Sequence, residues 1–498
     1  MSPRYRTRLG RRRSIAAASA CLLLAACSSS TPAADSAAGK LTVRTTPALN
    51  PGYSASVPDY TLRCSAGKPV TLRAEVPSGQ TLALDGGPAE SGSISKRVAL
   101  RPGQAFRLTA GDANGHSATH YVRCVPRDLP KWKVERHGTP VANWIAFSPT
   151  ERETPPRGAP YSVIADGHGV PVWWARAEGA TPLDTTVLPD GTVAWARLGG
   201  PFSQTYWDHV QLDGTALPPL NTVGEGADHH DLEVLPNGNR LMIAYMPRDH
   251  VDLRRVGGPR DAAVFDGEVQ ELTPDGKLVW SWSTEGHINL NETPAWRFRR
   301  TDQKYNGRPA FDLIHTNSVQ YAGPNLLISG KNVNAVYLVR RSDGRILWKL
   351  GGTTRPESLT IKHDPYGPKV FGAQHDARMQ PDGTVSLHDN ATFRHGHVPR
   401  IVRYRINTRA RTATLVQRFT DKRVRGSYCC GSAQRLSHGH WLVDWGANPI
   451  ITELRGNGSP VLTLKLPRKL FSYKAHSVEP GVLTRDALRA GMDAQYPR

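Results

Sequence analysis

The chain has 498 residues, more than one ordinary domain holds, and 63 Lys and Arg against 43 Asp and Glu give it a net charge of +20. The basic residues are spread along the chain without a basic run interleaved with aromatic residues, so nucleic-acid binding explains the charge poorly. An anionic envelope surface or an anionic substrate suits it better, and ordinary solvated surface accounts for most of these charges.

Residues 1–26 have the pattern of a signal peptide. Six arginines, without any acidic residue, precede or begin the apolar stretch that ends at Ala26. This stretch is too short to span a bilayer as a stable helix, and no later stretch is long and apolar enough to do so. Removal of the peptide leaves a net charge of +14, because six of the positive charges belong to it. The pair Arg12-Arg13 is a weak match to a twin-arginine signal.

The apolar stretch ends in Leu24-Ala25-Ala26-Cys27, which is typical of a lipoprotein processing site. In such a site small residues fit the peptidase, and the sulfur of Cys27 takes the lipid. Residues 27–39 are small and polar, as in a flexible tether that holds a domain away from a membrane surface. We therefore expect an extracytoplasmic protein that is lipid-anchored to the cell membrane. An ordinary secretory peptide with a chance cysteine is the alternative.

Apart from Cys27, the cysteines that follow the predicted signal peptide form two pairs along the chain. Cys64 and Cys124 stand at the two ends of one β-rich segment, and disulfides persist outside the cytoplasm, so we predict a bond between them. Closing this loop would stabilise the fold by about 4 kcal/mol in the chain-entropy model. Cys429 and Cys430 are adjacent and form either a vicinal disulfide or two thiols. Because the chain has no Cys-x-x-Cys pair, we do not expect a structural zinc site.

Residues 40–126 predict a small β-sandwich of immunoglobulin or cadherin type. Short β-prone segments recur there at close spacing, between turns rich in Pro, Gly, Asp and Asn. The segments are Leu41–Thr45, Val70–Ala74, Ser95–Ala99 and Ala105–Thr109. Apart from the two cysteines, this domain has no cluster of His, Cys and acidic residues. We interpret it as a spacer or a binding module.

Residues 131–480 predict a β-propeller. Helical periodicity is almost absent, while an x-Pro-Asp/Asn-Gly turn and a strand that begins at Gly and ends in Trp both recur. The turns are Leu188–Gly191, Leu235–Gly238, Gln380–Gly383 and a degenerate Leu436–Gly439, and the strands are Gly169–Trp173, Gly276–Trp280 and Gly344–Trp348. Spacings of 47 and 56 residues between successive turns are typical of propeller blades. The expected fold class is all-β: a six-bladed β-propeller, with Trp residues packed between blades, preceded by a small β-sandwich and followed by a tail over residues 481–498.

Four polar clusters interrupt otherwise apolar strand contexts in this region. They are Asp228–Asp231, Phe311–Val319, Leu327–Val333 and Phe371–Ala377. Three of them place a His at about the same position ahead of a turn and strand, so propeller symmetry would bring these histidines together at the axis. One such His alone is more often a structural hydrogen-bonding residue. Three in register, together with a Lys, favour a functional site.

The run from Asp228 to Trp445 resembles the arylsulfotransferase family, PAPS-independent enzymes with a six-bladed propeller. The matching motifs are His230-Asp231, His315-Thr316-Asn317-Ser318, Leu326–Lys331, Gly344–Gly352, Gln374-His375-Asp376-Ala377-Arg378 and Ala433–Arg435. The resemblance covers residues 130–480 and does not include the N-terminal domain. Lys331 stands where the family usually has Arg. Lysine keeps the positive charge but loses the two-pronged fork that matches a sulfuryl group.

The resemblance implies transfer of a sulfuryl group from an aryl sulfate donor to a phenolic acceptor through a sulfohistidine intermediate. His375, in the Gln-His motif, would be the nucleophile that carries the group. His230 or His315 would act as acid and base toward the two phenols. Lys331 and Asn317 would donate hydrogen bonds to the sulfuryl oxygens.

Three neighbours of these residues, His229, Gln374 and Arg378, are expected to contact the substrate. Asp231 or Asp376 would orient a histidine or, equally, cap the end of a strand. We expect no cofactor, no metal and no nucleic-acid partner, and we expect the membrane to be reached through the lipid anchor only.

Two other functions stay open at this point. One is an exported propeller that binds an anionic or aromatic ligand, or an envelope partner, without catalysis. The other is a metal site, since neutral imidazoles suit zinc or copper. Its ligands would be His229, His230, His315 and His375.

Overall fold

The computed structural model describes residues 41–65, 67–151, 160–198, 205–224, 226–293, 304–367, 370–392 and 394–498. The predicted signal peptide, the predicted lipid site Cys27 and the predicted tether lie outside the described residues. Strands account for 49% of the structure and helices for 5%, so the protein is all-β, as its sequence predicts. Within the described residues, no helix is both long and apolar enough to cross a membrane.

The N-terminal part consists of two sheets that share one hydrophobic core. The first contains β1 (Thr42–Thr46), β3 (Val70–Val76) and β6 (Gly92–Val98), and the second contains β2 (Asp59–Leu62), β8 (Ser117–Cys124), β7 (Ala105–Gly111), β4 (Thr81–Leu84) and β5 (Ala89–Glu90). Residues alternate between buried and exposed along β3, so one face of each strand supplies the core. Cys64 and Cys124 are bonded across this part, with Cα atoms 5.7 Å apart, which confirms the predicted pairing.

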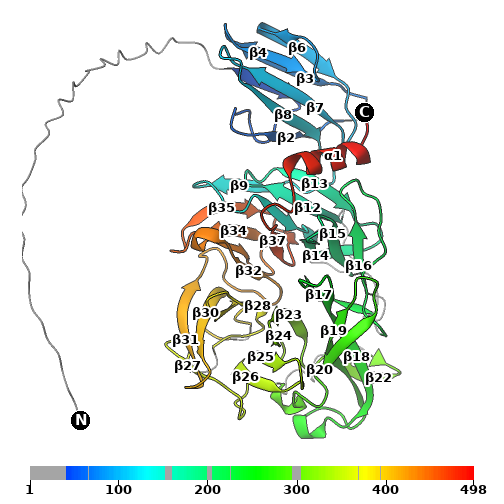
Figure 1. The fold of residues 1–498 in the computed structure, drawn as a ribbon, viewed down its shortest axis with the longest axis vertical. Helices are drawn as coiled ribbons and strands as arrows, with labels where there is room; N and C mark the ends of the chain where they lie inside the picture. Colours follow the sequence, from blue (N-terminus) through cyan, green and yellow to red (C-terminus); the bar gives the residue numbers. More distant parts are fainter. Residues whose placement is uncertain are drawn as a thin grey trace, which may run out of the picture.

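Six sheets of three or more strands, called the six larger sheets below, follow within the described residues between 133 and 477 (Figure 1). The first sheet has the strand order β13 (Pro171–Arg176), β12 (Tyr161–Asp166), β10 (Trp144–Phe147), β37 (Ala475–Ser477). The second has the order β14 (Thr181–Val187), β15 (Val193–Leu198), β16 (Trp207–Val210). The third has the order β17 (Ala227–Val234), β18 (Arg240–Val251), β19 (Ala262–Leu272), β22 (Arg308–Phe311), β21 (Lys304–Tyr305), and β20 (Leu278–Ser283) also pairs with β19. The fourth sheet has the order β23 (Thr316–Ala322), β24 (Asn325–Gly330), β25 (Ala335–Arg340), β26 (Ile346–Gly351). The fifth has the order β28 (His375–Met379), β29 (Thr384–Asp389), β30 (Arg400–Asn407), β31 (Thr412–Phe419), β27 (Thr360–Lys362). The sixth has the order β32 (Ser432–Arg435), β33 (Trp441–Asp444), β34 (Ile450–Leu454), β35 (Pro460–Lys465), β9 (Lys133–Arg136). A short pair, β11 (Thr150–Glu151) and β36 (Leu470–Phe471), lies beside them.

One edge strand of each sheet contacts an edge strand of the next sheet. The contacts run from β14 to β17, β23, β28, β32, β37 and back to β14. The two ends of this region cross over: β9 pairs with β35 of the last sheet, and β37 pairs with β10 of the first. This exchange fastens the first sheet to the last and covers two strand edges that would otherwise be free to pair with another chain.

The recurring turns have the geometry that their sequence predicts. The glycines at Gly191, Gly238 and Gly383 have φ values of 84°, 83° and 73°, a region that glycine adopts without a steric penalty. The tryptophans pack between sheets as expected: Trp173 Nε1 donates to Leu212 O and Trp280 Nε1 donates to Arg341 O, each in a turn after a strand of the following sheet. The turns therefore set the spacing of the sheets, and the tryptophans fix each sheet against its neighbour.

The C-terminal segment forms a helix where the sequence predicts a tail. Helix α1 (Arg485–Gln495) begins at Thr484, whose hydroxyl accepts a hydrogen bond from Ala487 N–H. Only two apolar side chains, Leu488 and Met492, carry the buried stripe, which is too sparse for a helical period to stand out in the sequence. The helix lies between the N-terminal sheets and the six larger sheets (Figure 1).

Ion pairs tie this helix to both parts of the protein. Asp59 in β2 accepts from Arg489 Nε at 2.9 Å and also contacts Arg485. Arg485 lies 3.3 Å from Asp166 in β12, and Arg123 in β8 pairs with Asp493 of the helix at 2.8 Å. The carboxylate of Asp59 therefore holds two helix arginines at the boundary between the two parts.

Replacing Asp59 should loosen the helix. In Asp59→Asn the two arginines lose their buried counter-charge, which we expect to cost about 3 kcal/mol of docking free energy. Amide hydrogen exchange at Leu488 and Met492 should then become about 10²-fold faster, since the helix amides exchange through local opening. Asp486→Asn is the control, because the side chain of Asp486 is 93% exposed and its ion pair contributes little. Equal exchange rates in the two variants would contradict this role of Asp59.

Candidate functional site

Four of the edge strands that contact the next sheet, β14, β17, β23 and β28, carry β-bulges, and the last three of these strands overlap predicted polar clusters. The register of pairing shifts between 183 and 186, 227 and 232, 316 and 318, and 375 and 378. A bulge bends its strand and re-aims the side chains next to it. His315 and Asp376 have φ values of 57° and 53°, a left-handed conformation that side chains other than Gly rarely adopt. The backbone is therefore distorted where the sheets meet, and polar groups gather there.

Three of the predicted histidines come together from three sheets. The ring centroid of His230 lies 4.5 Å from that of His315 and 6.1 Å from that of His375. The ammonium of Lys331 lies 3.4 Å from His315 Nε2. His229 flanks the group, with its ring centroid 4.0 Å from that of His230. Four polar side chains separated by up to 145 positions in sequence thus surround one small volume.

Two carboxylates that the sequence analysis did not single out orient these imidazoles. Asp228 accepts a hydrogen bond from His230 Nδ1, and Asp312 accepts one from His315 Nδ1. Each carboxylate leaves the Nε2 of its histidine free of a proton and fixes the ring. The signal was present in the sequence as an Asp two or three residues before each His.

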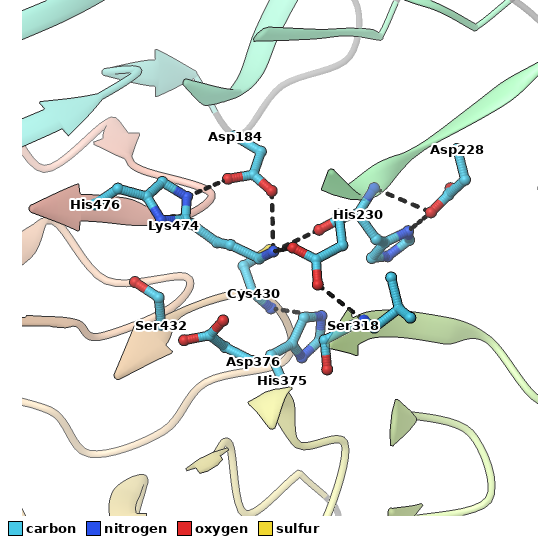
Figure 2. Close-up of polar contacts among 12 residues, drawn as sticks. Asp184, Asp228, His230, Ser318, His375, Asp376, Cys430, Ser432, Lys474 and His476 are labelled. Atoms are coloured by element: carbon cyan, nitrogen blue, oxygen red, sulfur yellow. Dashed lines mark hydrogen bonds and ion pairs between the residues drawn. The ribbon is translucent and has the colours of Figure 1, made fainter. Parts of the chain in front are cut away.

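His375 is held by backbone and amide groups. Its Nδ1 lies 3.1 Å from Ala373 O and 3.2 Å from Asn390 Nδ2, and its Nε2 accepts the Cys430 N–H at 3.2 Å (Figure 2). These contacts place the ring proton on Nδ1 and the lone pair on Nε2. Cys429 and Cys430 are bonded to each other, so the vicinal disulfide alternative holds in this structure.

Burial dominates the pKa shifts in this cluster. Burial and the neighbouring charge of Lys331 lower the pKa of His375 well below 6.5, and burial with the nearby His315 and Lys331 does the same for His230. Burial lowers the pKa of His229 to about 3 and raises the pKa of Asp228 to about 7. The imidazoles of His230 and His375 are therefore neutral at neutral pH, as a nitrogen nucleophile or base must be.

Asp231 and Asp376 hold the frame and do not orient a histidine. Asp231 accepts Val319 N–H at 2.9 Å, and Asp376 accepts Ala433 N–H at 2.8 Å, in each case from the next sheet. Ser318 and Ser432 accept backbone N–H groups of the following strands in the same way. The capping role left open by the sequence is the one that the structure has.

Three other predicted site residues are committed to protein partners. Asn317 Nδ2 donates to Gln374 O at 2.6 Å, which fixes the strand that bears His375. Gln374 Nε2 lies 3.0 Å from three acceptors in the preceding sheet, namely Ser329 Oγ, Gly330 O and Ala335 O. Arg378 donates to Asp231, Asp376 and Val319 O. The sequence predicts that Gln374 and Arg378 contact the substrate. In the structure their N–H groups donate to protein acceptors instead, and both side chains cross-link neighbouring sheets.

A buried lysine that the sequence analysis missed lies beneath the histidines. Lys474 Nζ donates to Asp184 Oδ2 and Asp231 Oδ1, both at 2.9 Å, and to His230 O at 2.5 Å (Figure 2). Burial opposes its charge, but Asp184 and Asp231 raise the pKa of Lys474 above its usual value. Burial also opposes ionisation of Asp231, yet Arg378 and Lys474 together lower the pKa of that carboxyl. The ammonium thus fixes the backbone at His230.

The described residues include one group with the spacing of a metal site. Ligand atoms of Asp228, His229 and His230 lie within 4.8 Å of one another. However, Asp228 already accepts from the Nδ1 and the backbone N–H of His230, and its other oxygen lies 3.3 Å from His229 Nδ1. Oδ1 of Asp228 is therefore occupied by His230, while Oδ2 makes no hydrogen bond within the described residues, and the contacts of Oδ1 fit a carboxylate that orients an imidazole.

The comparison of the sequence with known families matches the arylsulfotransferase (ASST) family over residues 203–466. This chain belongs to the arylsulfotransferase family. The matched region contains the histidine cluster, Lys331 and both orienting carboxylates, so the arylsulfotransferase resemblance of the motifs is confirmed at the level of the family. No curated protein matches the sequence significantly.

Several solved structures share a distant likeness with this arylsulfotransferase-family chain. A protein of unknown function from Bacteroides caccae has a TM-score of 0.41 at 13% identity, covering 67% of this chain and 97% of that one. A putative 6-phosphogluconolactonase from Bacteroides fragilis has a TM-score of 0.40 at 12% identity, covering 68% and 99%. A virginiamycin B lyase from Staphylococcus aureus has a TM-score of 0.34 at 10% identity, covering 68% and 88%. Likenesses this distant say nothing about function.

Removing the Lys474 ammonium should destabilise the family domain. In Lys474→Met two carboxylates lose a buried partner, which we expect to lower the free energy of unfolding by about 3 kcal/mol or more. Urea denaturation followed by tryptophan fluorescence measures this loss. Lys465→Met is the control, since the side chain of Lys465 is 33% exposed and its pair with Glu135 should contribute less than about 1 kcal/mol. A loss no larger than that of the control would show that the junction does not depend on Lys474.

Proposed function

We propose that this protein transfers a sulfuryl group from an aryl sulfate to a phenolic acceptor, with a histidine as the covalent carrier. One observation carries the proposal beyond family membership. Three imidazoles and one ammonium face each other, and the acceptor at Nδ1 of each imidazole takes its proton and leaves a lone pair on Nε2. Such a group accepts a sulfuryl group on one nitrogen and a proton on another.

In the first half-reaction, His375 Nε2 attacks the sulfur of the aryl sulfate. The N–S bond forms, the bond between sulfur and the aryl oxygen breaks, and the electron pair leaves on the phenolate, which takes a proton from water after release. Lys331 offsets the negative charge of the sulfuryl oxygens. Before the attack, Nε2 must give up the hydrogen bond from Cys430 N–H, whose length of 3.2 Å is at the weak end of the usual range.

In the second half-reaction, the acceptor phenol gives its proton to His230 Nε2 as its oxygen attacks the sulfur. The N–S bond then breaks and returns the electron pair to His375. The imidazolium of His230, formed when it takes the proton of the phenol, is stabilised by Asp228, which accepts a hydrogen bond from the Nδ1 of the same ring. His230 finally releases the proton to water, so the group transfer is balanced without any cofactor.

His315 is the second candidate for the carrier. Its side chain is 16% exposed, whereas His375 is 1% exposed as a residue. The neighbouring ammonium of Lys331 would hold a sulfuryl group on either ring. The Gln-His motif favours His375 as the carrier, and the greater exposure of the side chain favours His315. The position of the sulfuryl adduct in the sequence distinguishes the two.

The proposal includes the architecture that presents this site. The six sheets would be the blades of a closed propeller, the two N-terminal sheets would form a β-sandwich, and residues 131–480 and 40–126 would be the two domains. Export and attachment through Cys27 would place the protein outside the cytoplasm, where aryl sulfates and phenols reach it.

Neither the alternative of a non-catalytic ligand-binding propeller nor this enzyme needs a nucleic-acid partner. The Cys430 hydrogen bond on His375 is the observation that favours the binding protein.

Incubation with p-nitrophenyl sulfate should add one sulfuryl group to the protein. Trypsin separates the three histidines, because Arg240, Lys331 and Arg378 end different peptides that contain His230, His315 and His375. Peptide mass spectrometry at neutral pH should find the adduct on His375, and His375→Ala should lose it. An adduct on the His315 peptide that persists in His375→Ala would reassign the carrier. Absence of any adduct or transfer with varied aryl sulfates would favour the binding-protein alternative.

The pH dependence of adduct formation should reflect the lowered pKa of His375. A lowered pKa keeps the imidazole neutral, and therefore nucleophilic, at pH values below 6.5. The burst of nitrophenolate should stay constant as the pH falls through 6.5 and decline only at lower pH. The measurement is made in Asp228→Asn, because burial raises the pKa of Asp228 to about 7 and its titration would overlap. A midpoint at or above 6.5 would contradict a buried, neutral nucleophile.

A further inference from the structure

The histidine cluster offers almost no hydrogen-bond donor to a substrate. His230 spends its N–H on Asp228, His315 on Asp312, and His375 on Ala373 O. With their pKa values lowered, His230 and His375 carry no second proton at neutral pH. The Nε2 atoms of these three rings therefore present lone pairs, and the ammonium of Lys331 brings hydrogens to the cluster. The aryl oxygen that gains charge as the ester bond breaks still lacks a donor.

Tyr473 lies against the same cluster and has an unused donor. It lies between β36 and β37, and its ring is edge-on to His229, His230 and His375, with centroid distances of 5.4, 5.7 and 6.3 Å. The residue is only 3% exposed, and among the described residues its hydroxyl has no hydrogen-bond partner. A buried hydroxyl without a partner costs free energy, so its presence here points to a ligand that completes the bond.

The Tyr473 hydroxyl is also a donor that keeps its proton. Burial raises its pKa well above 10, and the carboxylates of Asp228 and Asp184 raise it further. The other described phenol near the cluster, Tyr245, already lies 3.4 Å from Thr316 O. Tyr473 is therefore a neutral O–H group beside the imidazoles at neutral pH.

We propose that Tyr473 is a catalytic residue that donates a hydrogen bond to the phenolic oxygen of the substrate. This inference rests on the proposed sulfuryl transfer and adds the group that holds the leaving and attacking oxygen. The sulfuryl oxygens carry their charge before the reaction, and a cation such as Lys331 suits them. Charge on the aryl oxygen appears only as the S–O bond breaks, and a neutral donor placed there stabilises the transition state selectively.

The role of Tyr473 is the same in both half-reactions. As His375 Nε2 bonds to sulfur, the aryl oxygen leaves with the electron pair and accepts the hydrogen bond from Tyr473. When the acceptor phenol enters, Tyr473 donates to its oxygen while His230 removes its proton. No proton is transferred by Tyr473 itself, so its hydroxyl is unchanged at the end of each half-reaction and the balance of the reaction is unaltered.

The test uses Tyr473→Phe in the full-length protein, a change that deletes only the hydroxyl. A donor to the leaving oxygen matters most when the leaving phenolate is strongly basic. We expect adduct formation to slow by about 10²-fold with phenyl sulfate and by much less with p-nitrophenyl sulfate. The melting temperature should stay the same or rise, since a buried hydroxyl without a partner is removed. Tyr337→Phe is the matched control, because its buried hydroxyl donates to Glu292 at 3.2 Å. It should lower the melting temperature and leave the rate unchanged.

A binding measurement keeps this test separate from the proposed transfer reaction. Tyr473→Phe should bind p-nitrophenolate about tenfold more weakly than the unaltered protein, as followed by the phenolate absorbance. An unaltered protein that binds the phenolate in this way but forms no sulfuryl adduct would overturn the transfer reaction alone. Unchanged rates and unchanged phenolate affinity in Tyr473→Phe would overturn the role of Tyr473, as would an equal rate loss with both aryl sulfates or a lowered melting temperature with normal rates.

Discussion

The buried ammonium of Lys474 is the interaction on which the arrangement of the site depends. A charge without water is tolerated only when every donor has a partner, and this one has three acceptors from two sheets. One acceptor is the carbonyl of His230, so the lysine whose charge is balanced by Asp184 and Asp231 also fixes the backbone of a histidine in the cluster. Because Lys474 itself precedes the strand β37 that joins the last segment of the chain to the first sheet, this contact forms only when the sheets have come together.

The carboxylates around the site divide into two sets with different work. Asp231 and Asp376 accept backbone N–H groups of the neighbouring sheet and are paired with Arg378, so they hold the sheets at a fixed distance. Asp228 and Asp312 contact imidazoles and set which ring nitrogen carries the proton. A rigid frame and an oriented cluster are thus supplied by the same residue type, and the difference lies in whether the carboxylate meets backbone N–H groups of the next sheet or an imidazole.

Sequence reasoning reached the parts of this protein that are encoded locally. Glycine turns, sheet-packing tryptophans and the disulfide partner of Cys64 each depend on a few neighbouring residues or on one spacing, and the family motifs marked the histidines. The residues that escaped, Lys474 and Tyr473 among them, come from a segment without a turn signal and outside the motifs that carry the family resemblance. The role of Lys474 arises only when distant parts of the chain meet, because its partners Asp184 and His230 lie more than 200 positions away. The C-terminal helix escaped for the same reason, since its apolar stripe is short and its arginines find Asp59 across the whole chain.

Burial gives the cluster its neutral imidazoles but also limits them. An unprotonated nitrogen is nucleophilic, yet a nitrogen inside the protein must be satisfied by some donor, and for His375 that donor is the amide of Cys430. Asn390 contacts both the other nitrogen of His375 and the carbonyl of Cys430, so ring and peptide are held as one unit. In the proposed reaction, attack by His375 Nε2 on a sulfate ester would exchange this weak hydrogen bond for a covalent bond. In the proposed reaction the nucleophile stays hydrogen-bonded to the protein until a substrate arrives, so the substrate oxygen needs a donor that has no protein partner. Among the described residues that surround these imidazoles, the hydroxyl of Tyr473 is such a donor.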